Sequence, residues 1–281
     1  MPTIDEKRVY DARTGTTRAL VASTIGVVRV EVSDDIVGEF GIEHRCTARD
    51  LATAGDALAV ATDEDVLVGG FEPTDHGPAV AVGVDGDATF AAAPDGTVSR
   101  LVRGADEWEA LGEVEEPRRM AGSLVAAADG VHRVRGGVVE YVGLDDVRDV
   151  AAGGVPLAVT GEALYTLGNG WMRDLQGDFR AVATDAAGER AVAATPEEVY
   201  ERADDGVEWD AHPEAGVVDA AVASELLVAV TDGGEIRVHA AGAEPGDGGA
   251  DAGSPWRGRH IGVPDGAAVV LPGSGSTDGG E

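Results

Sequence analysis

The sequence of 281 residues has very little positive charge. Lys7 is its only lysine, and 21 basic residues face 52 acidic ones, which gives a net charge of −31. A surface this acidic repels the phosphates of nucleic acids and of anionic lipids, so we expect neither as a partner. So few lysines with so many carboxylates are typical of halophiles, whose high internal salt screens the repulsion. We therefore expect a halophilic source.

Cysteine and long apolar runs are scarce too. Cys46 is the only cysteine, which excludes an intramolecular disulfide and a cysteine metal cluster. No apolar run approaches the ~20 residues of a membrane-spanning helix, and the first ten residues, MPTIDEKRVY, lack the apolar segment of a signal peptide. Since 43% of the residues are nevertheless hydrophobic, a folded core is within reach. We expect a soluble, cytoplasmic protein without membrane contact.

Beside these absences stands an internal repeat. Short apolar runs of small residues recur every 31 to 38 residues, a period typical of architectures built from similar supersecondary units. The residues matched across the seven runs are Thr24, Thr62, Ala93, Ala128, Thr160, Thr195 and Thr231. Seven such units use most of the chain and leave no room for a separate domain.

Each unit has the same internal order. A small apolar run leads into an acidic or glycine turn such as Asp129-Gly130, and Asp-Gly between apolar runs is a strong hairpin signal because both residues tolerate positive φ. A strand with alternating polar and apolar residues follows, as in 27–32 (VVRVEV) and 235–240 (EIRVHA). In several units a third strand comes next, and a further run such as 148–153 (RDVAAG) leads into the next unit.

Four short strands per unit and seven units predict an all-β chain folded as a seven-bladed β-propeller. A solenoid would need a shorter and stricter period, and a β-sandwich would not give seven matching units. We expect one propeller domain over 1–272, a loop at 242–254 in the last blade and a disordered tail over 273–281. The run 266–272 (GAAVVLP) is a candidate closing strand beside 8–13 (RVYDAR). Which terminus closes the ring stays open.

The stretch 20–52, LVASTIGVVRVEVSDDIVGEFGIEHRCTARDLA, together with the blade pattern after it, resembles a family of haloarchaeal β-propeller proteins that has no established activity. The resemblance runs over most of the chain and is strongest in the first two blades. It implies the propeller fold and a halophilic source, and it brings no catalytic residue with it.

Catalytic and metal-binding signatures are missing. The pair Trp209-Asp210 occurs once, whereas WD repeats carry it in most blades, and the segment GSGS at 273–276 lacks the strand–turn–helix context of a nucleophile elbow. The segment VDGD at 84–87 has too few oxygen ligands for calcium. No metal-ligand spacing joins the six histidines, His44, His76, His132, His212, His239 and His260. We expect no metal, no cofactor and no catalytic residue, which favours a chain that is not an enzyme.

Charged residues recur where the innermost strands begin, near the mouth of the central channel of a propeller. The eight candidate site residues are Arg49, Asp50, Arg118, Arg119, Arg148, Asp149, Arg180 and Asp219. Guanidiniums with interspersed carboxylates are suited to an anionic small molecule or an acidic peptide, which they hold by bidentate hydrogen bonds. The alternative is structural: each Arg pairs with an Asp of the next blade and locks the ring.

Two functions fit these observations. The first is a non-catalytic, monomeric propeller that acts as a binding or assembly platform for another protein. The second is an enzyme or sensor of a small anionic ligand, with Asp50 or Asp149 as general base. The ligand would be bound by Arg118, Arg119, Arg148 and Arg180. The two functions make different predictions for the candidate side chains. A sensor or enzyme requires that they converge on an open pocket, whereas a non-catalytic platform allows them to pair between blades.

Overall fold

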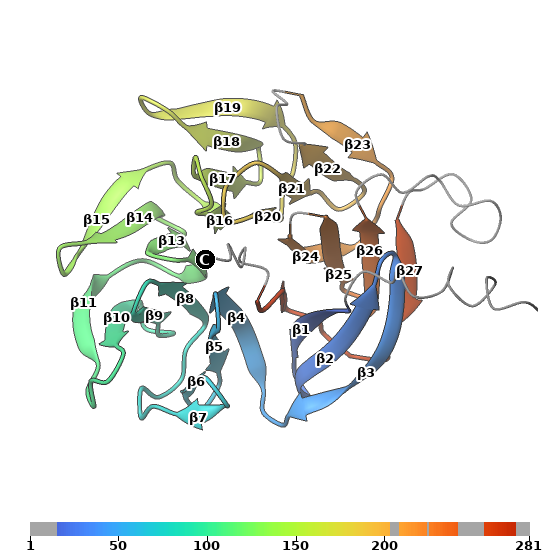
Figure 1. Cartoon of the computed structure of the whole chain (residues 1–281). Coiled ribbons are helices and arrows are strands. Elements are labelled where there is room, and N and C mark those ends of the chain that lie inside the picture. The colour runs from blue at the N-terminus through green and yellow to red at the C-terminus, as the bar shows by residue number, and fades with distance from the viewer. Residues whose placement is uncertain (1–15, 203–207, 224, 241–255, 274–281) are drawn as a thin grey trace, which may run out of the picture.

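The computed structural model describes residues 16–202, 208–223, 225–240 and 256–273, and these form seven antiparallel sheets of four strands each. The sheets stand as blades around a central axis (Figure 1). From the axis outwards, blade 1 consists of β28 (Ala268–Val270), β1 (Thr17–Ser23), β2 (Gly26–Ser33) and β3 (Ile36–His44). In blades 2 to 7 the strands follow one another outwards in chain order.

Blade 2 consists of β4 (Ala48–Ala54), β5 (Ala57–Thr62), β6 (Val66–Val68) and β7 (Glu72–Pro73). Blade 3 consists of β8 (Ala81–Asp85), β9 (Ala88–Ala92), β10 (Thr97–Val102) and β11 (Glu109–Glu113). Blade 4 consists of β12 (Pro117–Ala121), β13 (Leu124–Ala127), β14 (Gly130–Arg135) and β15 (Val138–Gly143). Blade 5 consists of β16 (Val147–Ala151), β17 (Leu157–Thr160), β18 (Ala163–Leu167) and β19 (Trp171–Gln176). Blade 6 consists of β20 (Ala181–Thr184), β21 (Ala191–Ala194), β22 (Val199–Arg202) and β23 (Asp210–His212). Blade 7 consists of β24 (Val217–Val222), β25 (Leu226–Thr231), β26 (Glu235–Ala240) and β27 (Arg257–His260).

These sheets confirm the prediction of an all-β, seven-bladed propeller with four antiparallel strands per blade. The described residues contain no α-helix, and therefore no apolar helix long enough to cross a membrane. The segments 8–13, 242–254 and 274–281, for which we predicted a strand, a loop and a tail, lie outside the described residues.

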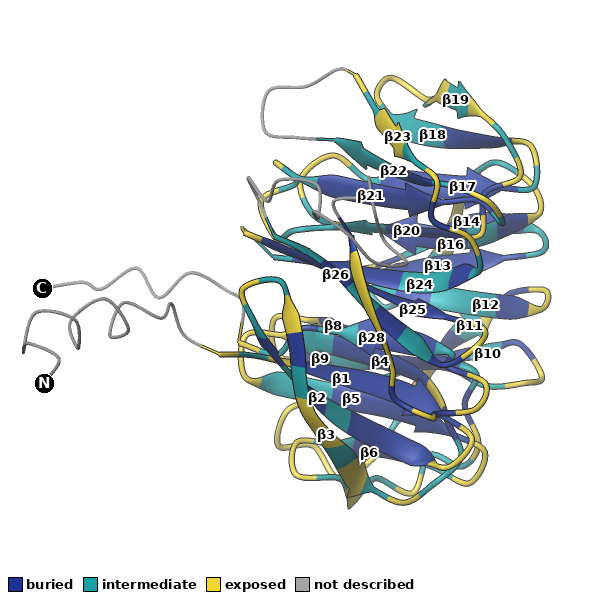
Figure 2. Ribbon diagram, turned by 90° about the vertical axis from the view of Figure 1, so that its right-hand side faces the viewer, coloured by how far each residue is buried: buried dark blue, intermediate teal, exposed yellow. Residues whose placement is uncertain are grey.

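The core lies between neighbouring blades rather than inside any one sheet. The second strands are almost wholly buried and rich in alanine and valine, as in β13 and β21. One buried cluster joins Val192 and Val199 of blade 6 to Val217 and Leu227 of blade 7. Small side chains suit this position because blades converge towards the axis, whereas the outermost strands β3 and β19 carry mostly partly or fully exposed side chains (Figure 2).

A side-chain hydroxyl at the end of the second strand shapes the turn that follows. Thr62 Oγ1 donates to Asp65 O at 2.6 Å and accepts from Asp65 N at 2.9 Å. Hydroxyls make the same kind of bond in four other blades, at Ser23, Thr160, Thr195 and Thr231. In blade 1 the hydroxyl belongs to Ser23, one residue before the Thr24 that we matched in the sequence.

The ring closes with a strand from the C-terminal side. β28 lies within the closing strand predicted at 266–272, and it pairs with β1, so that Leu20 is opposite Val270 and Ala22 is opposite Ala268. Two arginines of β27 also hold blade 7 to blade 1. Arg257 pairs with Asp35 at 2.5 Å, and Arg259 Nη1 donates to the carbonyls of Val37 and Gly38 at 3.0 and 2.6 Å.

Candidate functional site

Four innermost strands share a bulge that aims a charged side chain into the channel. The register of β4, β12, β16 and β24 shifts two residues after each strand begins, between Ala48 and Asp50 in β4. The residues after the shift are Asp50, Arg119, Asp149 and Asp219, which we call the central layer. The matching positions of the other three blades carry alanine, namely Ala81, Ala181 and Ala268.

Each aspartate of the central layer bonds to the following blade. The Oδ2 atoms of Asp50, Asp149 and Asp219 accept hydrogen bonds from the backbone N–H groups of Val82, Val182 and Val269 at 3.0, 2.8 and 2.7 Å. Each donor directly follows one of the three alanines. The blades are thereby joined in the pairs 2 and 3, 5 and 6, and 7 and 1.

Seven blades cannot all be paired, and the remaining blade, blade 4, carries the cation. Arg119 Nη1 lies 3.6 Å from Asp50 Oδ1, and Nη2 donates to the backbone carbonyl of Ala267. Because Asp50 and Ala267 belong to opposite ends of the chain, this one guanidinium ties blade 4 to blades 1 and 2. The Arg119 side chain is only 23% exposed.

The central layer holds three carboxyl groups around one guanidinium, and burial dominates their protonation. Burial raises the pKa of Asp50 to about 7, although Arg119 favours the charged form. Burial, reinforced by the Asp219 carboxylate, raises the pKa of Asp149 to about 8, and burial raises the pKa of Asp219 as well. Burial lowers the pKa of Arg119, but the three carboxylates outweigh it and raise that pKa. The layer therefore keeps protons at neutral pH.

The arginines one residue earlier on the strands point elsewhere. Arg118 pairs with Asp146 at 2.7 Å and donates to Val147 O at 3.1 Å. Arg148 pairs with Asp178 at 2.7 Å and donates to Phe179 O at 2.9 Å. Both guanidiniums thus clamp the entry of the next blade's innermost strand.

Arg49 and Arg180 complete the set of eight candidates. Both side chains are exposed, and within the described ranges neither has a carboxylate within 4.0 Å. The structure therefore divides the candidates into a central layer of four buried or half-buried groups, two clamps and two exposed arginines.

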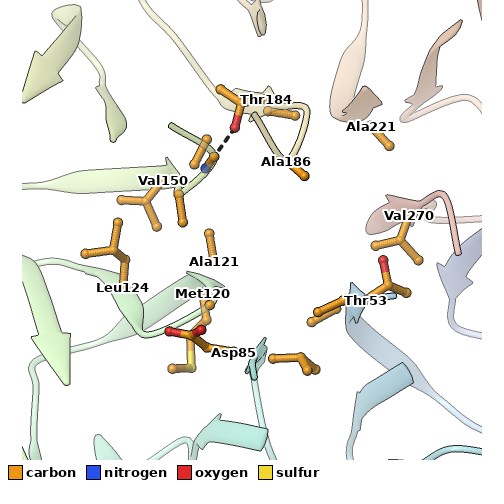
Figure 3. A pocket seen from close by; sticks show the side chains of 18 of the residues that line it. Thr53, Asp85, Met120, Ala121, Leu124, Val150, Thr184, Ala186, Ala221 and Val270 are labelled. Atoms are coloured by element: carbon orange, nitrogen blue, oxygen red, sulfur yellow. Dashed lines mark hydrogen bonds between the residues drawn. The ribbon is translucent and has the colours of Figure 1, made fainter. Parts of the chain in front are cut away.

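A cavity opens at the other ends of the innermost strands. We call this cavity of about 700 Å³ the funnel. Its walls come from 51–55, 120–124, 150–153, 182–186, 220–222 and 269–271. Figure 3 shows Thr53, Ala121, Val150, Thr184 and Val270 around the hollow. The wall segments follow directly after the central layer along the strands, so the layer lies at the base of the funnel.

None of the eight candidates is among the described residues that line the funnel. Sequence reasoning considered only the face where the innermost strands begin and so missed this cavity. The signal was present in the small residues after each charged position, such as 52–55 (ATAG) and 151–154 (AAGG). Side chains this small leave space near the axis.

A second group missed in the sequence lies between blades 6 and 7. Glu201 Oε1 is 2.8 Å from His239 Nδ1 and 3.7 Å from His212 Nε2. Three strands from two blades bring these residues together, which sequence spacing does not show. In the described part of the chain, no three His, Cys, Asp or Glu side chains are arranged to hold a metal ion.

Comparison with known proteins gives a family and a fold. A family model described as Beta-prop_HVO_0234-like, beta propeller, matches residues 3–272. No curated protein matches the sequence.

Several solved structures share the architecture. A functionally unknown protein from Desulfotomaculum acetoxidans DSM 771 is 8% identical, with a TM-score of 0.66 over 91% of this chain and 99% of that chain. YCF48 bound to D1 peptide is 13% identical, with a TM-score of 0.54 over 76% of this chain and 82% of that chain. The extracellular domain of BT4673 from B. thetaiotaomicron is 12% identical, with a TM-score of 0.55 over 78% of this chain, which spans only 38% of that chain. At such identities the likeness establishes the fold alone.

Proposed function

The chain belongs to the Beta-prop_HVO_0234-like β-propeller family, and from this fold and the geometry of its channel we propose that it is a non-catalytic platform that binds another protein. The observation that carries the proposal is that most of the charged candidate side chains bond to a neighbouring blade. Arg118 and Arg148 each bond to a carboxylate and a carbonyl at the next blade. The aspartates of the central layer bond to backbone N–H groups of neighbouring blades. These groups therefore join neighbouring blades and are not available for catalysis.

The funnel supports a protein partner. Its walls are mostly alanine, glycine and valine, with a few hydroxyls such as Thr53 and with the charged residues Asp85, Arg133, Arg135 and Asp185. Such walls offer shape and small apolar contacts but no nucleophile beside a general base. YCF48, a propeller of similar fold, has a D1 peptide bound in its structure. A propeller of comparable size is therefore able to present a peptide-binding surface.

A second candidate function is the sensing of a small anion on the face where the innermost strands begin. The exposed Arg49 and Arg180 favour it, since within the described ranges neither is ion-paired. Guanidiniums that remain accessible are able to bind a carboxylate or phosphate bidentately.

We further propose that the protein works in a salt-rich cytoplasm, as a monomer with no nucleic-acid or membrane partner. The net charge of −31 supports this setting, because so many carboxylates repel one another and repel phosphates unless salt screens them.

The proposal is tested by capture of partners from an extract of the producing cells in molar KCl, with three baits. The baits are the parent chain, Ala152→Trp and Arg49→Ala/Arg180→Ala. Ala152 is exposed and lines the funnel, so the indole occupies part of the cavity without entering the core. We expect a protein that is retained by the parent and by the double arginine variant and is lost with Ala152→Trp.

Retention by all three baits would place the contact elsewhere and contradict the role of the funnel. Loss only with Arg49→Ala/Arg180→Ala would favour the anion-binding face. Equal melting temperatures of the three baits are the control that each is folded.

A further inference from the structure

One side of the funnel carries two arginines that the clamps and the central layer do not use. Arg133 and Arg135 on β14 both line the cavity. Among the residues that the structure describes, neither has a carboxylate within 4.0 Å. Arg135 is exposed and Arg133 is partly buried. In a chain with so few cations, two unpaired guanidiniums on one strand stand out.

Both arginines face blade 5. In the β13–β14 ladder Arg133 is opposite Leu124, and Val131 is opposite Ala126. Leu124, Ala126 and Val131 are buried together with Val147, Val150 and Ala158, all from blade 5. Because alternate residues of a strand share a face, Arg133 and Arg135 lie on the same side as Val131.

The opposite wall is formed by the turn that follows β16. Ala152, Gly153 and Pro156 line the same cavity, and the neighbouring Val155 is 51% exposed. The funnel thus extends outwards between blades 4 and 5, with guanidiniums on one wall and small apolar groups on the other. We call this extension the blade 4–5 groove.

Carboxylates lie around the groove, but among the described residues none forms an ion pair with these two arginines. Asp185 lines the funnel from blade 6, and its Oδ1 accepts from Glu189 N at 2.9 Å within its own turn. Asp85 lines it from blade 3 and lies beside Gly122 at the end of β12. Glu140 is opposite Arg133 in the β14–β15 ladder, but it too is more than 4.0 Å from the guanidinium, so both arginines remain free to bind a further carboxylate.

We propose that the blade 4–5 groove binds an extended acidic segment of a partner protein. Its carboxylates pair with Arg133 and Arg135, and small apolar side chains beside them enter the funnel. Planar guanidiniums recognise carboxylates through two parallel hydrogen bonds, a short-range contact that persists in high salt better than long-range attraction does. This inference rests on the proposed function, because it names the kind of segment that the platform binds.

The experiment is selection of a display library of random twelve-residue peptides on the immobilised parent chain in molar KCl. Selected peptides are then synthesised with a fluorescent label, and their affinities are measured by anisotropy. The proteins compared are the parent, Arg133→Gln/Arg135→Gln, Ala152→Trp and Arg103→Gln/Arg173→Gln. The last variant removes two exposed arginines from blades 3 and 5, neither of which lines the funnel, and it is the matched control for loss of charge.

We expect selected peptides with Asp or Glu beside Ala or Val. Their affinity should fall at least tenfold with Arg133→Gln/Arg135→Gln, and also when Gln and Asn replace the acidic residues of the peptide, but not with Arg103→Gln/Arg173→Gln. Peptides that lack acidic residues, bind all the arginine variants equally and are lost with Ala152→Trp would overturn this inference and leave the platform standing. Failure to select any peptide would count against both.

Discussion

The residue after the bulge of the innermost strand determines the chemistry of the channel. In three of the four blades with a bulge it is an aspartate that bonds to the next blade, and in the fourth it is the arginine that faces the aspartates. The three blades without a bulge carry alanine at the matching position. A buried carboxyl group with only one nearby cation is costly to ionise. The central layer therefore couples the stability of the ring to pH.

We predict that the protein becomes less stable as pH rises from 5 to 8. Burial holds the pKa of Asp50 at about 7 and that of Asp149 at about 8 in the folded state, whereas an unfolded aspartate titrates near pH ~3.9. Between these values the folded state binds more protons, so the free energy of unfolding falls as pH rises. Melting temperatures measured in constant molar KCl at pH 5.5 and 8.5 check this.

Asp149→Asn is the control for that pH dependence. An amide oxygen still accepts the hydrogen bond from Val182 N, which Asp149 accepts at 2.8 Å, and it does not ionise. The variant should lose much of the decline between pH 5.5 and 8.5. An unchanged decline would show that other groups cause it.

We also predict that Arg119→Met is strongly destabilising at high pH. It removes the cation that faces the carboxylates and the donor to Ala267 O. Removing one partner of a buried ion pair costs about 3–5 kcal/mol, and the loss should shrink at pH 5.5, where the carboxyl groups are protonated. Urea unfolding in molar KCl measures both values. The double variant Arg119→Met/Asp50→Asn should recover part of the loss at pH 8.5, and no recovery would contradict the pairing.

At the scale of the strand, we expect the hydrogen bond that an aspartate accepts to contribute more to stability at the closing seam, between blades 7 and 1, than at the other blade boundaries. β28 comes from the C-terminal side of the chain and pairs with β1 of blade 1, and the bond from Val269 N to Asp219 ties it to blade 7. Val182 N makes the same bond to Asp149 between blades 5 and 6, where the innermost strand continues directly into its own blade.

Val269→Pro and Val182→Pro form a matched pair, because each removes one such donor. We predict the larger fall in melting temperature for Val269→Pro. Amide exchange in β1 should also rise with Val269→Pro but not with Val182→Pro. Equal effects would show that the seam is no weaker than the other blade boundaries.

How much the sequence could predict depends on how local each feature is. The strands and turns of a blade follow from alternation and from Asp-Gly pairs, and the eight candidates were found as one set because they occupy equivalent places. Their division into a central layer and outer clamps follows from the bulges, in which Arg118 and Arg148 are the extra residues and the residue after each is turned towards the axis. The partner of Arg148, Asp178, is 30 residues away, and only the rotation between blades brings the two together. The position of the funnel likewise depends on how far the innermost strands stand from the axis.

For the whole molecule, charge sets the conditions under which the fold is stable. The net charge of −31 is spread over a surface with few cations, so mutual repulsion opposes the compact state wherever it is unscreened. The Debye length falls from about 10 Å at 0.1 M salt to about 3 Å at 1 M. At the higher value, carboxylates on neighbouring turns scarcely interact.

We therefore predict that the melting temperature falls steadily as KCl is lowered from about 3 M to 0.1 M, and that dialysis into low salt loosens or unfolds the protein. Sucrose is the control, because it favours the compact state without screening charge. If screening is the cause, sucrose in 0.1 M KCl should restore only part of the loss, whereas NaCl should replace KCl in full. A melting temperature that is the same at all salt concentrations would contradict the halophilic assignment, because the carboxylates would then be tolerated without screening. It would also mean that the acidic surface is less costly than its charge implies, and the binding experiments above would then belong at physiological salt.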